Sequence, residues 1–131
     1  MARAARDWVI DFAKTRTPSN LGSPLATLPR FQEAIGEIEG LLLTNRRLLT
    51  GTATDTDAGN PPTLAETGLI KLTVNRNALA AVERAVELGG NPGLARSNPL
   101  ERHYRDVLCA RVHSPQDDTV RLTAGRLALG I

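Results

Sequence analysis

The sequence has few aromatic and sulfur-containing side chains: one tryptophan, one tyrosine, two phenylalanines, one methionine and one cysteine among 131 residues. A single cysteine, Cys109, cannot form an intrachain disulfide, and its apolar neighbours predict a buried, unreactive thiol. No apolar run has the length of a transmembrane helix, and no signal-peptide pattern follows Met1. These absences indicate a cytoplasmic protein that does not contact the membrane and is stabilised by aliphatic packing.

Neither charge sign is in strong excess. The chain has 16 Lys and Arg against 14 Asp and Glu, a net charge of +2, and the basic residues are scattered along it. Nucleic-acid binding and attachment to a membrane surface are therefore not expected. The two histidines, His103 and His113, stand in no HxxxH or ExxH pair, and Cys109 has no partner ligand. We therefore predict no metal site.

Alanine, leucine and valine are abundant and recur at the three- and four-residue spacing of amphipathic helices. The pattern predicts one domain and these helices: residues 1 to about 15, residues 29 to about 50 closed by Gly51, residues 63 to 88 closed by Gly89-Gly90, and two more within residues 98–131. The predicted fold class is all-α: an antiparallel four-helix bundle with its last helix broken near His113.

Two predicted helices have features that suggest unusual surroundings. Gly36 and Gly40 lie in the interior of the second helix, where each costs about 1 kcal/mol relative to alanine. Because they share one face, we expect another backbone to approach them closely. The third helix carries apolar residues on two faces, which predicts burial both by a bundle neighbour and by another subunit or domain.

Two helix-start signals occur in the last third. Asn98 is a predicted cap, with Pro99 in the first turn and Glu101 in capping-box position. Ser114 is predicted to cap the next helix, with Pro115 and Asp117 in its first turn. The chain must bend between these helices, which leaves the titratable imidazole of His113 at the corner as the best candidate for chemistry.

Simpler interpretations stand beside this one. A Ser114–His113–Asp117 triad is disfavoured because Ser114 is explained as a cap and no nucleophile-elbow glycines flank it. His103 is expected to make a structural hydrogen bond, and Arg105 and Asp106 an internal salt bridge. Gly89-Gly90 is most simply a helix C-cap. Residue patterns alone lead only to a helical bundle with one candidate histidine.

Four stretches together resemble the C-terminal helical domain of acyl-CoA dehydrogenases: Gly89-Gly90, the ERHYRD segment at 101–106, the His113-Ser114-Pro115 junction, and residues 121–126. The junction is most similar to the two-component flavin-dependent monooxygenases of that superfamily, such as dibenzothiophene monooxygenase. In that branch a histidine of an H-x-P motif serves the active site.

The resemblance implies roles for particular residues. His113 would be the catalytic acid or base near the reactive flavin edge. Arg16, Gly89 and Gly90 would be cofactor-binding: the arginine reaches flavin across a subunit interface, and the glycines approach its diphosphate. The cofactor would be FAD or FMN in the complete enzyme. Ser114 stands where many dehydrogenases place their catalytic glutamate, so proton abstraction by a carboxylate at this position is not expected.

The resemblance also implies missing parts. Family members have an N-terminal helical domain and a central β domain, and neither is expected within residues 1–131. The chain would be an excised domain, a truncated reading frame, or a bundle that works beside separate N-terminal flavoenzyme chains. Alone it should bind little flavin, because most of the walls around the cofactor are missing. A homo-oligomer, dimer or tetramer, through the bundle is expected.

Two alternatives remain open at this point. The chain could be a non-catalytic helical oligomerisation module that lacks flavin. It could also hold a small ligand within the bundle, although the helix stripes offer no polar residues for this.

Overall fold

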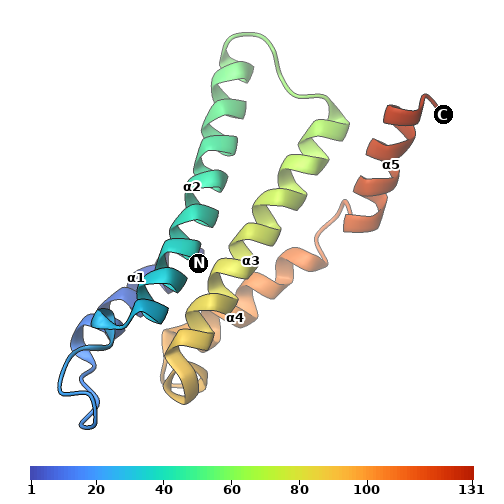
Figure 1. Cartoon of the computed structure of the whole chain (residues 1–131). Helices are drawn as coiled ribbons and strands as arrows, with labels where there is room; N and C mark the ends of the chain where they lie inside the picture. Colours follow the sequence, from blue (N-terminus) through green and yellow to red (C-terminus); the bar gives the residue numbers. More distant parts are fainter.

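The computed structural model describes residues 1–131, and the chain is entirely helical. Its α-helices are α1 (Ala2–Thr15), α2 (Pro29–Asp57), α3 (Leu64–Leu94), α4 (Pro99–Leu108) and α5 (Asp117–Leu129), with 3₁₀ turns at Leu25–Thr27 and Cys109–Arg111. Helices α1 to α4 alternate in direction, and α5 lies beside the end of α3 that is remote from α1 (Figure 1). The predicted all-α bundle, with a break between its last two helices, is confirmed.

All four bundle helices contribute to the main core. Its buried side chains are Ala5, Val9, Ile38, Ala81, Val82, Ala85, Leu100 and Val107. Small alanines on α1 and α3 let the helix axes approach, and the larger valine, leucine and isoleucine side chains fill the space between them. Each fully buried large aliphatic side chain contributes about 1.5 to 3 kcal/mol.

Helix α3 is the central element because it packs against α1, α2, α4 and α5. This accounts for its two apolar faces: helices of the same chain cover both. The N-terminus of α3 is fixed by the predicted capping box, in which Thr63 Oγ1 accepts from the Glu66 amide and Glu66 accepts from the Thr63 amide. Its first segment ends at Gly90, whose φ of +56° few other residues adopt.

The predicted end of α2 at Gly51 is wrong, since the helix continues to Asp57. Threonine hydroxyls along this part of α2 donate to carbonyls four residues earlier, so these polar side chains are satisfied within the helix: Thr50 to Arg46, Thr52 to Leu48, Thr54 to Thr50 and Thr56 to Thr52. Gly51 is thus an interior residue of α2 and does not end the helix.

The predicted close approach of a backbone to Gly36 and Gly40 is also wrong within this chain. Nothing lies within 4 Å of the position where a Cβ would stand at either glycine, and both are exposed. Packing within the monomer therefore does not explain why α2 has glycine at these two positions.

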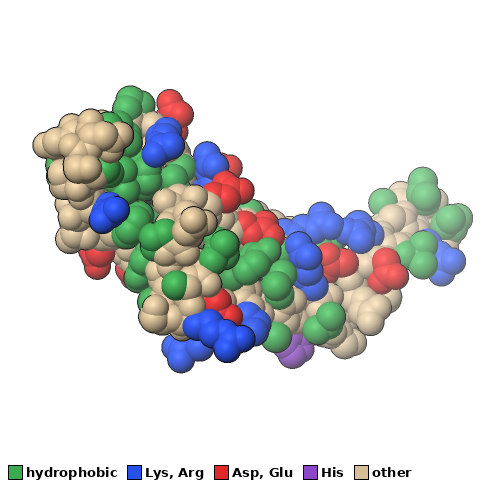
Figure 2. Space-filling view, turned by 90° about the horizontal axis from the view of Figure 1, so that it is seen from below, with side chains coloured by type: hydrophobic (Ala, Val, Ile, Leu, Met, Phe, Trp, Pro, Cys, Tyr) green, Lys and Arg blue, Asp and Glu red, His purple; other side chains and the backbone are tan.

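The surface mixes charge signs, and Figure 2 shows Lys and Arg side chains in several separate groups beside Asp and Glu. Hydrophobic side chains gather on the far end of this view, where α5 projects from the bundle (Figure 2). The α5 residues Leu122, Leu127 and Leu129 are 55%, 64% and 74% exposed. None of the helices combines the length and apolar character needed to cross a bilayer.

Candidate functional site

The connection between α4 and α5 holds the candidate histidine. α4 ends at Leu108, a 3₁₀ turn follows at Cys109–Arg111, and α5 begins at Asp117. His113 lies between the two helices, as the sequence predicted, and its side chain is exposed. We call residues 112–116 the α4–α5 link.

The predicted helix start at Ser114 is wrong. The N-cap residue of α5 is Gln116, no side chain caps it, and the Ser114–Pro115 peptide bond is cis. Asp117 and Asp118 do lie in the first turn, where their charge favours the helix dipole, and Asp118 Oδ1 accepts from the Thr119 amide at 2.7 Å. Carboxylates of the first turn thus replace the expected hydroxyl cap. The triad that would use Ser114 gains no support.

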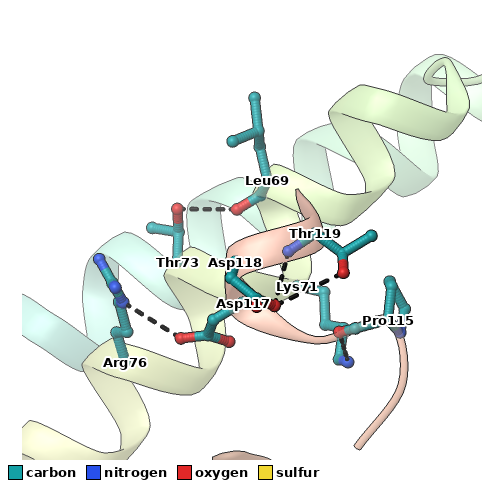
Figure 3. Close-up of polar contacts among 8 residues, drawn as sticks. All are labelled: Leu69, Lys71, Thr73, Arg76, Pro115, Asp117, Asp118 and Thr119. Carbon is teal, nitrogen blue, oxygen red and sulfur yellow. Dashed lines mark hydrogen bonds and ion pairs between the residues drawn. The ribbon is translucent and has the colours of Figure 1, made fainter. Parts of the chain in front are cut away.

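One lysine of α3 holds the link in place. Lys71 Nζ donates to the carbonyl oxygens of His113 and of Pro115, the latter at 2.8 Å. Close by, Arg76 Nε lies 3.7 Å from Asp117 Oδ2 (Figure 3). These contacts tie the link and the start of α5 to the N-terminal half of α3. Lys71 was not among the residues predicted for the site, although it is the one lysine in α3 and lies beside the helix's apolar stripe.

A cavity of about 520 Å³ lies between α3, α4 and the link. Its polar lining comes from Lys71, Asn75, Asp106, Cys109, His113 and Ser114, and Met1 and Ala2 also reach it. This volume is in the range of small-molecule sites. The cavity thus brings together an imidazole and a carboxylate, two side chains of the kinds that act as general acids and bases.

Two further predictions about this region are wrong. Cys109 is exposed, because it stands in the 3₁₀ turn and not on the buried stripe of α4. Arg105 pairs with Glu101, at 2.9 Å, and not with Asp106, because residues four apart are neighbours on a helix. Asn98 caps α4 as predicted, accepting from the Leu100 amide, but Glu101 is engaged by Arg105, so the reciprocal half of a capping box is not formed.

His103 does not belong to this site. It is partly buried on α4, its side chain makes no hydrogen bond in the chain, and the predicted structural bond is therefore wrong. Burial lowers the pKa of His103, and the positive chain terminus and Arg102 lower it further. Across the chain, no group of three His, Cys, Asp or Glu side chains is arranged to hold a metal ion.

The two glycines named for cofactor contact have different surroundings. A Cβ at Gly89 would lie 3.3 Å from both Leu100 Cδ1 and a ring carbon of Trp8, so this glycine permits α1, α3 and α4 to pack together. Gly90 has a positive φ and open space around it. Only Gly90 therefore offers its backbone to a ligand. The packing of the three helices is enough to explain why residue 89 is glycine.

Arg16 follows α1 directly and is exposed. Its amide donates to Phe12 O at 2.9 Å, its carbonyl accepts from the Leu25 amide at 3.0 Å, and its guanidinium makes no ion pair in the chain. Since Trp8 of α1 touches Gly89, the end of α1 and the glycine pair lie toward the same end of the bundle (Figure 1).

The structure does not bring all the named residues together. Lys71, which binds the His113 carbonyl, and Gly89 are 18 positions apart on α3 by their numbers. At 1.5 Å per residue this is about 27 Å. A single chain thus presents two separate surfaces: the His113 cavity, and the end of the bundle that carries Arg16 and Gly90.

Comparison with known proteins identifies the family. The model of the acyl-CoA dehydrogenase C-terminal domain matches residues 1–117. The chain belongs to this family. One relative is YdbM of Bacillus subtilis, which is named as an unverified acyl-CoA dehydrogenase. It is 37% identical over 122 residues, which cover 92% of this chain and 32% of YdbM. The chain thus spans about a third of the length of the curated relatives it matches.

Solved structures support the fold of this acyl-CoA dehydrogenase C-terminal domain. Butyryl-CoA dehydrogenase of Megasphaera elsdenii superposes with a TM-score of 0.87 at 20% identity, over 98% of this chain and 33% of that chain. PigA, solved as a complex with FAD, superposes with a TM-score of 0.84 at 19% identity, over 98% of this chain and 33% of that chain. At these identities the likeness concerns the fold alone.

Proposed function

We propose that this domain forms one wall of the flavin and substrate site of an acyl-CoA dehydrogenase-family oxidoreductase, and that His113 serves there as the proton acceptor or donor. The proposal is supported above all by the cavity that His113 lines together with Asp106, within a domain of this family. The domain spans about a third of the length of its relatives. In this proposal the remaining walls would come from the N-terminal helical domain and the central β domain that the family resemblance implies. The two further domains would be encoded in the same reading frame or belong to separate chains.

The end of the bundle with Arg16 and Gly90 suits a flavin diphosphate. A guanidinium without an ion pair and an open backbone at a positive-φ glycine are both able to bind phosphate oxygens. Bound flavin, for which FAD is the choice that PigA suggests, would supply the oxidation–reduction chemistry. Because this surface lies about 27 Å from the His113 cavity along α3, we assign the two surfaces of one chain to two different flavins. Each flavin site then needs more than one copy of the domain.

The residues of the link support a proposal for the reaction type. The cavity offers an imidazole at the link and a carboxylate only on α4, while Ser114 cannot abstract a proton unaided. This favours the flavin-dependent monooxygenase branch over a dehydrogenase that removes an α-proton with a carboxylate. Anaerobic mixing with acyl-CoA substrates distinguishes the two, because only a dehydrogenase would bleach the flavin absorbance.

The decisive experiment uses the reading frame extended by the DNA upstream of Met1. We expect this protein to purify with flavin, and residues 1–131 alone to purify without it. His113→Gln should lower turnover of the extended protein by about 10²- to 10⁴-fold. His103→Gln, a matched change on α4 outside the cavity, should not. Stoichiometric flavin on residues 1–131 alone, or equal turnover of the two variants, would contradict the proposal.

A second candidate function is a non-catalytic oligomerisation module. The exposed leucines of α5 and the uncovered glycines of α2 favour it, because both surfaces lack partners in the monomer. If the extended protein is oligomeric but purifies without flavin, that result would support this alternative over the enzyme.

A further inference from the structure

Lys71 carries a charge that no carboxylate of the chain pairs with. Its ammonium donates to the carbonyl oxygens of His113 and Pro115 (Figure 3), and it makes no ion pair. An ammonium has three N–H donors, so one remains after these two bonds. Lys71 is partly buried and lines the His113 cavity. Its charge and its remaining donor are therefore available to a molecule bound in that cavity.

Asn75 adds a second polar group on the same side of α3. It lies four positions after Lys71, and residues at this spacing are neighbours on a helix, about 5 to 6 Å apart between their Cβ atoms. Asn75 is partly buried and lines the cavity, yet its side-chain amide makes no hydrogen bond in the chain. The other asparagines of this region differ, because Asn45 donates to Val74 O at 2.9 Å and accepts from Asn77 at 2.9 Å. An amide in a cavity without a partner in the protein is suited to binding a ligand.

The rest of the cavity wall is mostly apolar. Ala78 of α3 and Val107 and Ala110 of α4 supply much of this apolar surface. Asp106 is the one carboxylate of the lining, but it is exposed, so water and salt screen its charge more than that of the partly buried Lys71. The cavity therefore favours a molecule with an apolar body and one negatively charged oxygen over a cationic molecule.

We propose that Lys71 and Asn75 together bind an oxygen of the substrate on which negative charge rests or develops. When His113 accepts a proton from the substrate, the electron pair of the broken bond stays on the substrate, and its charge spreads to this oxygen. The ammonium and the amide N–H stabilise that charge without giving up a proton. The substrate class is thus an apolar molecule with a carbonyl or an acidic hydroxyl group. This catalytic role rests on the proposed function, whereas binding of the oxyanion does not require flavin.

Titration of isotopically labelled residues 1–131, followed by NMR, tests the pair. Three probes share a phenyl ring and differ in charge: benzoate, benzyl alcohol and benzylamine. At constant ionic strength we expect benzoate to bind most tightly and to shift the amide signals of residues 71–78 and 106–114. Lys71→Met should raise the dissociation constant of benzoate by about tenfold or more, and Asn75→Leu by about two- to tenfold.

Matched variants separate ligand binding from the position of the link. Asn75→Leu leaves both bonds of Lys71 to the link in place, so weaker binding in this variant does not come from a displaced link. Lys14→Met, exposed on α1, and Thr73→Val, exposed on α3 outside the cavity lining, should bind benzoate like wild type. The proposal is overturned if benzoate shifts no cavity residue, if benzylamine binds at least as tightly, or if either cavity variant binds benzoate like wild type.

Failure of this pair and failure of the enzymatic role give different results. If the extended protein has neither flavin nor turnover, benzoate binding that depends on Lys71 and Asn75 supports the pair and counts against the enzymatic role. If turnover depends on His113 while both cavity variants bind benzoate like wild type, the enzymatic role stands and the pair is wrong. Anaerobic mixing of the extended protein with acyl-CoA substrates then shows whether the bound oxygen belongs to a thioester carbonyl or to an acidic hydroxyl.

Discussion

Gly68 of α3 sets how closely α5 packs, and replacing it should reveal how firmly α5 is held. A Cβ at Gly68 would lie 3.2 Å from both methyl groups of Val120, which is 6% exposed. Gly68→Ala gains about 1 kcal/mol of helix propensity. Overpacking against Val120 costs about 1 to 3 kcal/mol. We therefore expect a net loss of stability of about 0 to 2 kcal/mol, measured by urea denaturation.

A double-mutant cycle separates these two effects. In a Val120→Ala background the crowding methyl groups are gone, so Gly68→Ala should instead stabilise the chain by about 1 kcal/mol. The change in stability caused by Gly68→Ala thus has opposite signs in the two backgrounds. An identical effect of Gly68→Ala with and without Val120→Ala would refute the contact, and with it the seating of α5 that positions the link.

Four further changes have defined outcomes. Leu100→Ala should lower the free energy of unfolding by about 3 to 4 kcal/mol in urea denaturation, since Leu100 of α4 is fully buried against α3. Lys71→Met should cost about 1 kcal/mol and speed amide hydrogen exchange in α5, while Lys14→Met, an exposed control, should do neither. Hydrogen bonds from Thr63 lower the pKa of Glu66 below 4.5. The stabilisation from ionised Glu66 is therefore present above pH 4.5 and is lost as the pH falls through the folded-state pKa. Glu66→Gln should remove this part of the acid sensitivity in thermal unfolding measured at several pH values. Burial lowers the pKa of His103 below 6.5, so stability should decline as pH falls from 6.5 through its folded-state pKa, and the NMR titration midpoint of its ring should lie below 6.5.

The fold followed from the sequence wherever a helix signal was tied to a periodic apolar stripe. The stripes of α1 and α3, the Thr63–Glu66 capping box and the Asn98 cap all appear in the structure. Prediction failed where one local signal competed with another. Gly51 indicated an end to α2, but the helix continues to Asp57, and the threonines after the glycine direct their hydroxyls to carbonyls one turn back within the helix.

The candidate site was predictable only in part. The position of His113 between two helices was predicted, although the second of these helices begins at Asp117 and not at Ser114. The cavity did not, because it is formed by α3 and the link, whose contact depends on Lys71 reaching two carbonyls more than forty positions away in the sequence. Ser114 and Cys109 were misplaced for the same reason: the 3₁₀ turn and the link follow tertiary contacts and have no periodicity to read.

The bond between Lys71 and the link has an evolutionary consequence. The ammonium recognises main-chain oxygens, which every residue type provides. Residues 113 and 114 can therefore be exchanged while the course of the backbone past the cavity is preserved. A scaffold built in this way can acquire a different acid, base or neutral side chain by a single substitution, and so change its reaction before it changes its shape.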